Sequence, residues 1–152
     1  MTTQGAGVVV PDASVILKWV DRLSGEKDRE RADALMEAWM GGRLEIVVPR
    51  LWVFEVGNVL GRADPSSAAR TMSELAEYRF EEAEMTPDLF RTAFGLMKDF
   101  RVTFYDAAYH AVALLRKGVF VTADEAYCRK TAGRGGVVPL RDWGTEKAVP
   151  RK

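Results

Sequence analysis

Four acidic residues in this 152-residue chain lie where an apolar, strand-like run passes into a helix-like segment. Asp12 follows the run GVVV almost directly, and Asp124 follows VFVT. Glu55 lies one turn into the segment after LEIVV, and Asp106 begins the apolar segment after TFY. Carboxylates that enter a half-buried cluster repel one another and lose hydration, unless a cation offsets their charge. Oxygen ligands suit Mg²⁺ or Mn²⁺, so these acids predict a divalent-metal site.

Small polar residues accompany the acids at spacings that bring them to the same side. Ser14 lies two residues after the first acid, and Asn58 lies three residues after Glu55, on one helical face. Thr122 precedes the last acid by two residues, so on an extended strand both point to one side. We expect these groups to orient carboxylates or to hold metal-bound water. The alternative is local: caps and turn hydrogen bonds for the polar residues, and helix caps or salt bridges for the acids.

The elements that must position these residues follow from hydrophobic periodicity. Short apolar runs predict strands at 7–10, 44–48, 80–85, 119–122 and 137–138, the third as an edge strand. Amphipathic segments predict helices at 13–20, 27–40, 51–60, 65–78, 86–100, 105–117 and 124–132. Alternating strands and helices predict an α/β fold with a mostly parallel sheet. The carboxyl ends of parallel strands meet at one edge, so the four acids are expected to share that rim.

Length and composition favour one globular domain and exclude several classes of protein. We predict a single domain over 1–152, with a core at about 7–143 and a frayed tail at about 145–152. Lysine plus arginine and aspartate plus glutamate both number 22, so net charge gives no sign of bulk nucleic-acid binding. Cys128 is the only cysteine, which excludes an intrachain disulfide and favours a reducing, cytoplasmic setting. No secretory signal or membrane span is expected, because long apolar stretches are absent.

Other reactive or nucleic-acid-binding side chains are weaker candidates. His110 is the only histidine, which excludes ribonuclease chemistry that needs two; a packed or rim histidine is favoured over a metal ligand. Trp19, Trp52 and Tyr105 could stack on bases, although large aromatic residues more often pack in cores. Cations that could neutralise flanking phosphates are Lys18, Arg50, Arg129, Lys130 and Arg134.

Four segments together resemble one family of nucleases. They are VVVPDASVILKWV (8–20), PRLWVFEVGNVL (49–60), VTFYDAAYHAVALL (102–115) and VFVTADEAYCRK (119–130). In this order and spacing they resemble PIN-domain ribonucleases, most closely the VapC toxins of toxin–antitoxin pairs. The resemblance extends from Val8 to about Trp143.

The resemblance implies a three-layer α/β/α PIN-like fold with a central sheet of about five strands. It implies an Mg²⁺- or Mn²⁺-dependent endoribonuclease in which metal-assisted hydrolysis cleaves RNA, with tRNA or rRNA as substrate. The implied catalytic and metal-binding residues are Asp12, Glu55, Asp106 and Asp124, supported by Ser14, Asn58 and Thr122, with Glu125 as a possible further acid. The implied partners are a cognate antitoxin that inhibits the enzyme and a second copy in a homodimer, assembled as a toxin–antitoxin hetero-oligomer.

Three other interpretations stay open from the sequence. A housekeeping PIN nuclease of RNA maturation would carry the same acids with a different partner and target. A receiver-like or other α/β binding module is non-enzymatic, but receivers need adjacent acids after the first strand, and Asp12 is followed by Ala13. A haloacid-dehalogenase-like phosphatase would need an Asp-x-Asp pair, and Ser14 stands in place of the second acid.

Overall fold

A five-stranded parallel sheet forms the centre of the protein. The computed structural model describes residues 7–20 and 27–145. All paired strands run parallel, in the order β3-β2-β1-β4-β5. The strands are β1 (Gly7–Pro11), β2 (Leu44–Val48), β3 (Glu81–Glu82), β4 (Val119–Thr122) and β5 (Val137–Pro139). The predicted α/β fold with a mostly parallel sheet of about five strands is confirmed.

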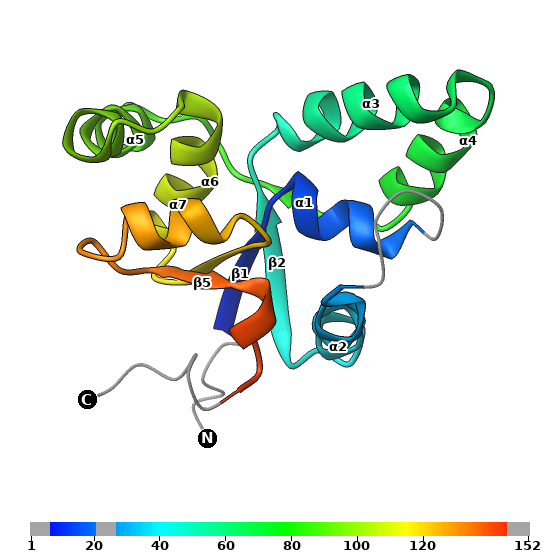
Figure 1. Ribbon diagram of the computed structural model, residues 1–152, viewed down its shortest axis with the longest axis horizontal. Helices are drawn as coiled ribbons and strands as arrows, with labels where there is room; N and C mark the ends of the chain where they lie inside the picture. The colour runs from blue at the N-terminus through cyan, green and yellow to red at the C-terminus, as the bar shows by residue number, and fades with distance from the viewer. Residues whose placement is uncertain (1–6, 21–26, 146–152) are drawn as a thin grey trace.

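Helices connect successive strands and cover the sheet. They are α1 (Ala13–Ile16), α2 (Arg29–Met40), α3 (Trp52–Ala63), α4 (Pro65–Ala76), α5 (Pro87–Phe100), α6 (Phe104–Leu115) and α7 (Glu125–Lys130), with 3-10 turns η1 (Leu17–Trp19) and η2 (Leu140–Asp142). α6 packs on β1, β2 and β4 and carries α5 on its outer side, whereas α2 packs on β2. Figure 1 shows α2 and the α5–α6 pair on opposite sides of the sheet, which gives the predicted three layers. Among the described residues, no helix has the length and apolar character needed to cross a bilayer.

The order of the strands determines where a ligand can reach the sheet. From β1 the chain adds β2 and β3 on one side, and later β4 and β5 on the other. The connections therefore change direction between β1 and β4, which are direct neighbours. Ligands of open α/β sheets bind outside the carboxyl ends of the strands at such a switch point. Asp12 follows β1 at this position, and its backbone N–H donates to the carbonyl of Val121 in β4 at 3.3 Å.

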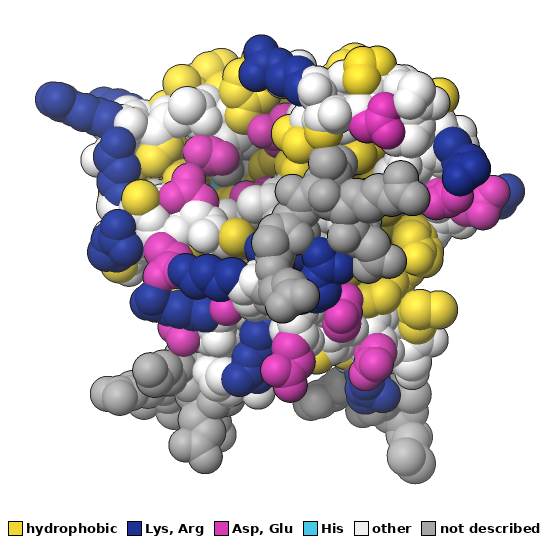
Figure 2. Space-filling view, turned by 45° about the vertical axis from the view of Figure 1, so that its right-hand side comes forward, with side chains coloured by type: hydrophobic (Ala, Val, Ile, Leu, Met, Phe, Trp, Pro, Cys, Tyr) yellow, Lys and Arg dark blue, Asp and Glu magenta, His cyan; other side chains and the backbone are white. Residues whose placement is uncertain are grey.

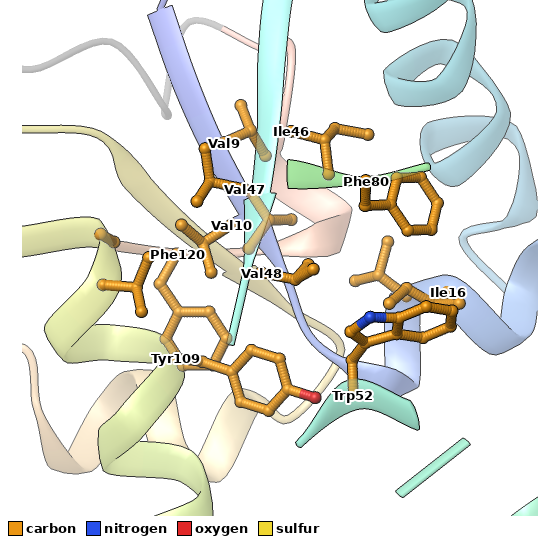
Figure 3. Packing of buried hydrophobic residues seen from close by; sticks show 14 of the residues in the cluster. Val9, Val10, Ile16, Ile46, Val47, Val48, Trp52, Phe80, Tyr109 and Phe120 are labelled. Atoms are coloured by element: carbon orange, nitrogen blue, oxygen red, sulfur yellow. The ribbon is translucent and has the colours of Figure 1, made fainter. Parts of the chain in front are cut away.

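Two packed groups of side chains hold the sheet between its helices. Val10, Val47 and Phe120 are fully or almost fully buried in the main core, which Figure 3 shows from close by. Phe80, directly before β3, lies in an aromatic cluster with ring centroids 5.9 Å from Trp19 and 5.5 Å from Trp52. Both tryptophans therefore serve packing, and base stacking by them is not supported.

Several predicted boundaries differ from the structure for local physical reasons. The strand predicted at 80–85 is only Glu81–Glu82, because Phe80 turns into the aromatic cluster. The helix predicted at 13–20 tightens into the 3-10 turn η1 after Ile16. After α6, Lys117 rather than the following Gly118 adopts the left-handed conformation, with φ 53°. A Cβ at Gly118 would lie 2.4 Å from the Val8 carbonyl oxygen, so this glycine allows β4 to approach β1. The predicted frayed tail lies outside the described residues, except for Thr145.

Candidate active site at the carboxyl ends of the strands

Asp12 is the most buried acidic residue at the rim. It is 7% exposed and caps α1, with its Oδ1 accepting from the backbone N–H of Ser14 at 3.0 Å. The Ser14 hydroxyl also donates to Oδ1, and Thr122 Oγ1 donates to Oδ2 at 2.6 Å. The capping interpretation is therefore correct for Asp12, and the same contacts fix both carboxylate oxygens in one orientation.

Thr122 and Ser14 link the ends of β1 and β4 into one network. Besides donating to Asp12, Thr122 Oγ1 accepts the backbone N–H of Asp124 at 3.0 Å. The Ser14 hydroxyl oxygen accepts the backbone N–H of Ala123 at 2.9 Å. These two small side chains thus tie the first acid to the loop that carries the last one, which is the positioning expected from their spacing.

Burial dominates the electrostatics of Asp12. Loss of hydration is the main cause that raises its pKa from 3.8 to about 6; hydrogen bonds from Ser14 and Thr122 oppose this shift, and the charge of Asp106 adds to it. The folded chain therefore holds this proton more tightly than the unfolded chain. The contribution of Asp12 to stability is full below about pH 4 and is lost as the pH rises to about 6.

Replacing Asp12 by asparagine should remove this pH-dependent loss of stability. In EDTA at pH 7 we expect Asp12→Asn to exceed the wild type in free energy of unfolding by roughly 1–3 kcal/mol. The difference should shrink towards zero near pH 4, where the wild-type carboxyl is also neutral. Urea unfolding of both proteins between pH 4 and 8 measures it. A difference that does not change with pH would contradict the raised pKa.

Glu55 lies in the first turn of α3, half-buried, with one oxygen unpaired. Its Oε1 is a buried atom with no hydrogen-bond partner among the described residues. Burial raises its pKa, the nearby Tyr109 hydroxyl opposes the shift, and the charge of Asp106 adds to it more weakly. Asn58, one turn later in α3, is exposed. Glu55 therefore has a carboxylate oxygen that can accept a new ligand.

Asp106 is electrostatically coupled to each of the other three acids. It stands in the first turn of α6, where its backbone N–H donates to the Oγ1 of the N-cap residue Thr103 at 3.2 Å. Burial and the charge of Asp124 raise the pKa of Asp106. Its own charge raises the pKa of Asp12 and of Glu55. Four segments far apart in sequence thus bring their carboxyl groups into one interacting set.

Asp124 is the exposed member of this set. It caps α7, and its Oδ1 accepts the backbone N–H of Tyr127 at 3.0 Å. The next residue, Glu125, is paired with Arg141 and lies 3.6 Å from Lys27 Nζ, so it is engaged away from the other acids. Figure 2 shows acidic side chains gathered around a hollow in the upper part of one face.

The four acids offer the ligand atoms that a hard divalent cation prefers, but their side chains are not arranged around a common ion position. All offered ligands are carboxylate oxygens, the donors that Mg²⁺ and Mn²⁺ prefer, and their mutual repulsion is what a cation would relieve. The unpaired Oε1 of Glu55 is an available donor. However, no three acidic, histidine or cysteine side chains of residues 7–20 and 27–145 converge closely enough to hold an ion as they stand. Direct coordination of one ion by three or more of these acids would require side-chain rotation, whereas one or two carboxylates together with water molecules suffice for a hard cation.

His110 and Cys128 are structural rather than reactive. Nδ1 of His110 shares a hydrogen bond with the Tyr127 hydroxyl at 2.8 Å, and its Nε2 contacts the Gly135 carbonyl at 2.7 Å. Both ring nitrogens are thus occupied, and the metal-ligand interpretation of His110 is wrong. Burial raises the pKa of the Cys128 thiol to about 11, which keeps it protonated and unsuited to nucleophilic attack.

The candidate RNA-contacting residues differ in their exposure. Tyr105, next to Asp106, is 61% exposed and remains available for stacking. Lys130 Nζ donates to the Arg101 carbonyl at 3.0 Å. The exposed cations of the predicted set are Arg50, Arg129, Lys130 and Arg134, and Lys18 is partly exposed.

Two residues near the acids were not identified from the sequence. Thr103 stands three residues before Asp106, a spacing typical of a helix N-cap followed by an acid at the third position, so the signal was present. Tyr109 has its hydroxyl beside Glu55. Nothing in its apolar surroundings distinguishes it from a core tyrosine.

Comparison with known proteins agrees with this geometry. The family model of the PIN domain matches residues 9–133, which include all four acids. The chain belongs to the PIN-domain family. Its predicted resemblance to that family is confirmed, and the receiver-like and phosphatase-like interpretations are set aside. No curated protein matches the chain.

Two solved structures share the architecture of this PIN domain. The protein PAE2754 from Pyrobaculum aerophilum is 25% identical, with a TM-score of 0.62 over 91% of this chain and 92% of that one. A toxin–antitoxin complex from Klebsiella pneumoniae is 21% identical, with a TM-score of 0.62 over 87% of this chain and 97% of that one. At this identity the second likeness supports the fold.

Proposed function

We propose that this PIN domain is a divalent-metal-dependent endoribonuclease that acts as the toxin of a toxin–antitoxin pair. PIN domains are generally metal-dependent nucleases, and this chain carries acids at all the positions that the resemblance implies. The observation that carries the proposal is the coupling of Asp106 to the other three carboxylates. Such a set is unfavourable on its own and favourable around a cation.

Each residue of the proposed site has a distinct task. Asp12, Glu55, Asp106 and Asp124 would hold Mg²⁺ or Mn²⁺. When bound, the ion supplies an activated water and stabilises negative charge on the phosphate. Ser14 and Thr122 keep Asp12 oriented through the hydrogen bonds described above, and Asn58 offers an amide at the open side of α3. One of these carboxylates would accept a proton during the reaction.

RNA is the proposed substrate, with tRNA or rRNA as the class to test first. The exposed cations Arg50, Arg129, Lys130 and Arg134 can neutralise phosphates on either side of the cleaved bond. The exposed ring of Tyr105, adjacent to Asp106, can stack on a base. Because tRNA and rRNA are found in the cytoplasm, we propose that the protein acts there. We also propose that residues 1–152 form a single domain.

The proposed partners are a cognate antitoxin and a second copy of the chain. One structural relative was solved as a toxin–antitoxin complex, which supports an antitoxin here. Large exposed apolar side chains on α3 and on α5 are the candidate surfaces for a homodimer, because an interface would remove them from water. They are Phe54, 72% exposed, with Phe94, Phe90 and Val59.

Metal-dependent cleavage of RNA is the direct test of the proposed function. Purified protein without an antitoxin should cut total tRNA or rRNA in the presence of Mg²⁺ or Mn²⁺, and EDTA should abolish the cleavage. Restoring the divalent ion should restore it. Cleavage that persists in EDTA would contradict a metal-dependent mechanism. A neighbouring small reading frame that encodes an inhibitor of this cleavage would favour a toxin over a housekeeping nuclease.

A further inference from the structure

Two buried polar atoms without hydrogen-bond partners lie near the acidic set, one on α3 and one on α6. Among the described residues, neither Glu55 Oε1 nor the Tyr109 hydroxyl makes a hydrogen bond. The two groups are nevertheless neighbours, because the Tyr109 hydroxyl points towards the first turn of α3, which carries Glu55, and each group affects the pKa of the other. Buried polar groups in native proteins almost always find a partner. An unpaired donor beside an unpaired acceptor therefore indicates a contact that a small side-chain rotation completes.

Packing aims the Tyr109 hydroxyl at the first turn of α3. The residue is 0% exposed, and its ring stacks on Phe120 with centroids 5.8 Å apart and an interplanar angle of 11°. Figure 3 shows its hydroxyl extending towards Trp52, the first residue of α3. Glu55 lies three residues further along the same helix, and Tyr109 itself lies three residues after Asp106. The ring is therefore fixed by the core, and its hydroxyl faces the acidic set.

The Tyr109 hydroxyl can act as a hydrogen-bond donor at this place. A tyrosine hydroxyl is protonated at neutral pH, because its ordinary pKa is about 10. A neutral hydroxyl among carboxylates is a poor ligand for a hard cation, but it is a good hydrogen-bond donor to a carboxylate. It can fix the orientation of a ligand without adding charge.

We propose that Tyr109 is a positioning residue whose hydroxyl donates to the Glu55 carboxylate and so orients Glu55 towards a bound divalent cation. This inference rests on the proposed metal site. The groups that orient metal-binding carboxylates act through such hydrogen bonds, and removing one typically weakens metal binding by about 10–100-fold. Asp12 already accepts hydrogen bonds from the hydroxyls of Ser14 and Thr122. Among the described residues Glu55 has no such donors, so the Tyr109 hydroxyl is the group that can orient it.

Manganese affinity of Tyr109→Phe tests the proposal without requiring catalysis. Phenylalanine keeps the ring on Phe120 and removes the hydroxyl alone. Calorimetric titration with Mn²⁺ should give a Kd about 10–100-fold higher than that of the wild type. In EDTA the melting temperature should stay equal or rise, because an unpaired buried hydroxyl is removed. Tyr78→Phe is the matched control, since Tyr78 is 39% exposed and stacks on Phe80, and its affinity should equal that of the wild type.

A double-mutant cycle separates positioning from a general packing effect. In a Glu55→Gln background, followed by Mn²⁺ electron paramagnetic resonance, adding Tyr109→Phe should change the affinity by less than about 2-fold. Equal effects of Tyr109→Phe in both backgrounds would overturn the proposal, because the hydroxyl would then act independently of Glu55. Wild-type affinity in Tyr109→Phe would overturn it while leaving the metal site intact. Failure of the wild type to bind Mn²⁺ would overturn both this inference and the proposed function.

Discussion

Asp106→Asn should reduce RNA cleavage by more than about 100-fold. Replacing groups that merely orient metal ligands costs about 10–100-fold, and Asp106 is proposed as a direct ligand. It also interacts with each of the other three acids, so no neighbour can take its place without loss of the arrangement. Asparagine is nearly identical in shape and keeps the backbone N–H that donates to Thr103, so the fold should be retained. Initial rates on tRNA and rRNA at saturating Mn²⁺ measure the effect.

The control for Asp106→Asn is the same change at an exposed acid of α5. Asp99 is exposed and is not one of the proposed metal ligands, so Asp99→Asn should cleave RNA at the wild-type rate. In EDTA, Asp106→Asn should be as stable as the wild type or slightly more stable, because one source of repulsion is removed. Cleavage by purified Asp106→Asn at the wild-type rate would refute its assignment.

Mn²⁺ should raise the melting temperature of the wild-type protein by about 5–10 °C at a concentration about 100 times its Kd. A ligand at that ratio stabilises the folded state by about 2.7 kcal/mol, and 1 kcal/mol shifts the melting temperature of a chain of this size by about 2–4 °C. The physical source is relief of repulsion among carboxylates that folding has brought together and partly buried. Thermal unfolding at pH 7 with increasing Mn²⁺ measures the shift.

The stabilisation should depend on the acidic set rather than on ionic strength. Asp106→Asn should lose most of the shift, Asp99→Asn should keep it, and NaCl of equal ionic strength should not reproduce it. A shift of equal size in Asp106→Asn would place the bound ion elsewhere, and no shift in the wild type at millimolar Mn²⁺ would count against a metal site.

The fold and the rim were predictable because their signals are local and regular. Strand β4 lies at the predicted residues, and α4 begins at Pro65, where the predicted helix 65–78 begins. Parallel strands place their carboxyl ends at one edge, so the positions of Asp12 and Asp124 followed from two apolar runs alone.

Other features depend on tertiary contacts that no local pattern encodes. The role of Gly118 arises from a close approach to Val8, which is distant in sequence. His110 has the spacing of a residue facing Asp106, but its two hydrogen bonds come from α7 and the loop at Gly135. Tyr109 of α6 and Glu55 of α3 are far apart in sequence, and only the tertiary fold brings them together. Periodicity marks such residues as buried, and it does not reveal what their polar atoms meet.

Anomalous diffraction from crystals grown with Mn²⁺ is the most direct test of the claim that these carboxylates bind a common ion. The account predicts an anomalous peak about 2 Å from a carboxylate oxygen of Asp106, with at least one oxygen of Asp12, Glu55 or Asp124 also in direct coordination. A saturating Mn²⁺ concentration that leaves no peak among these four residues, or that gives a peak only at another place on the protein, would contradict it.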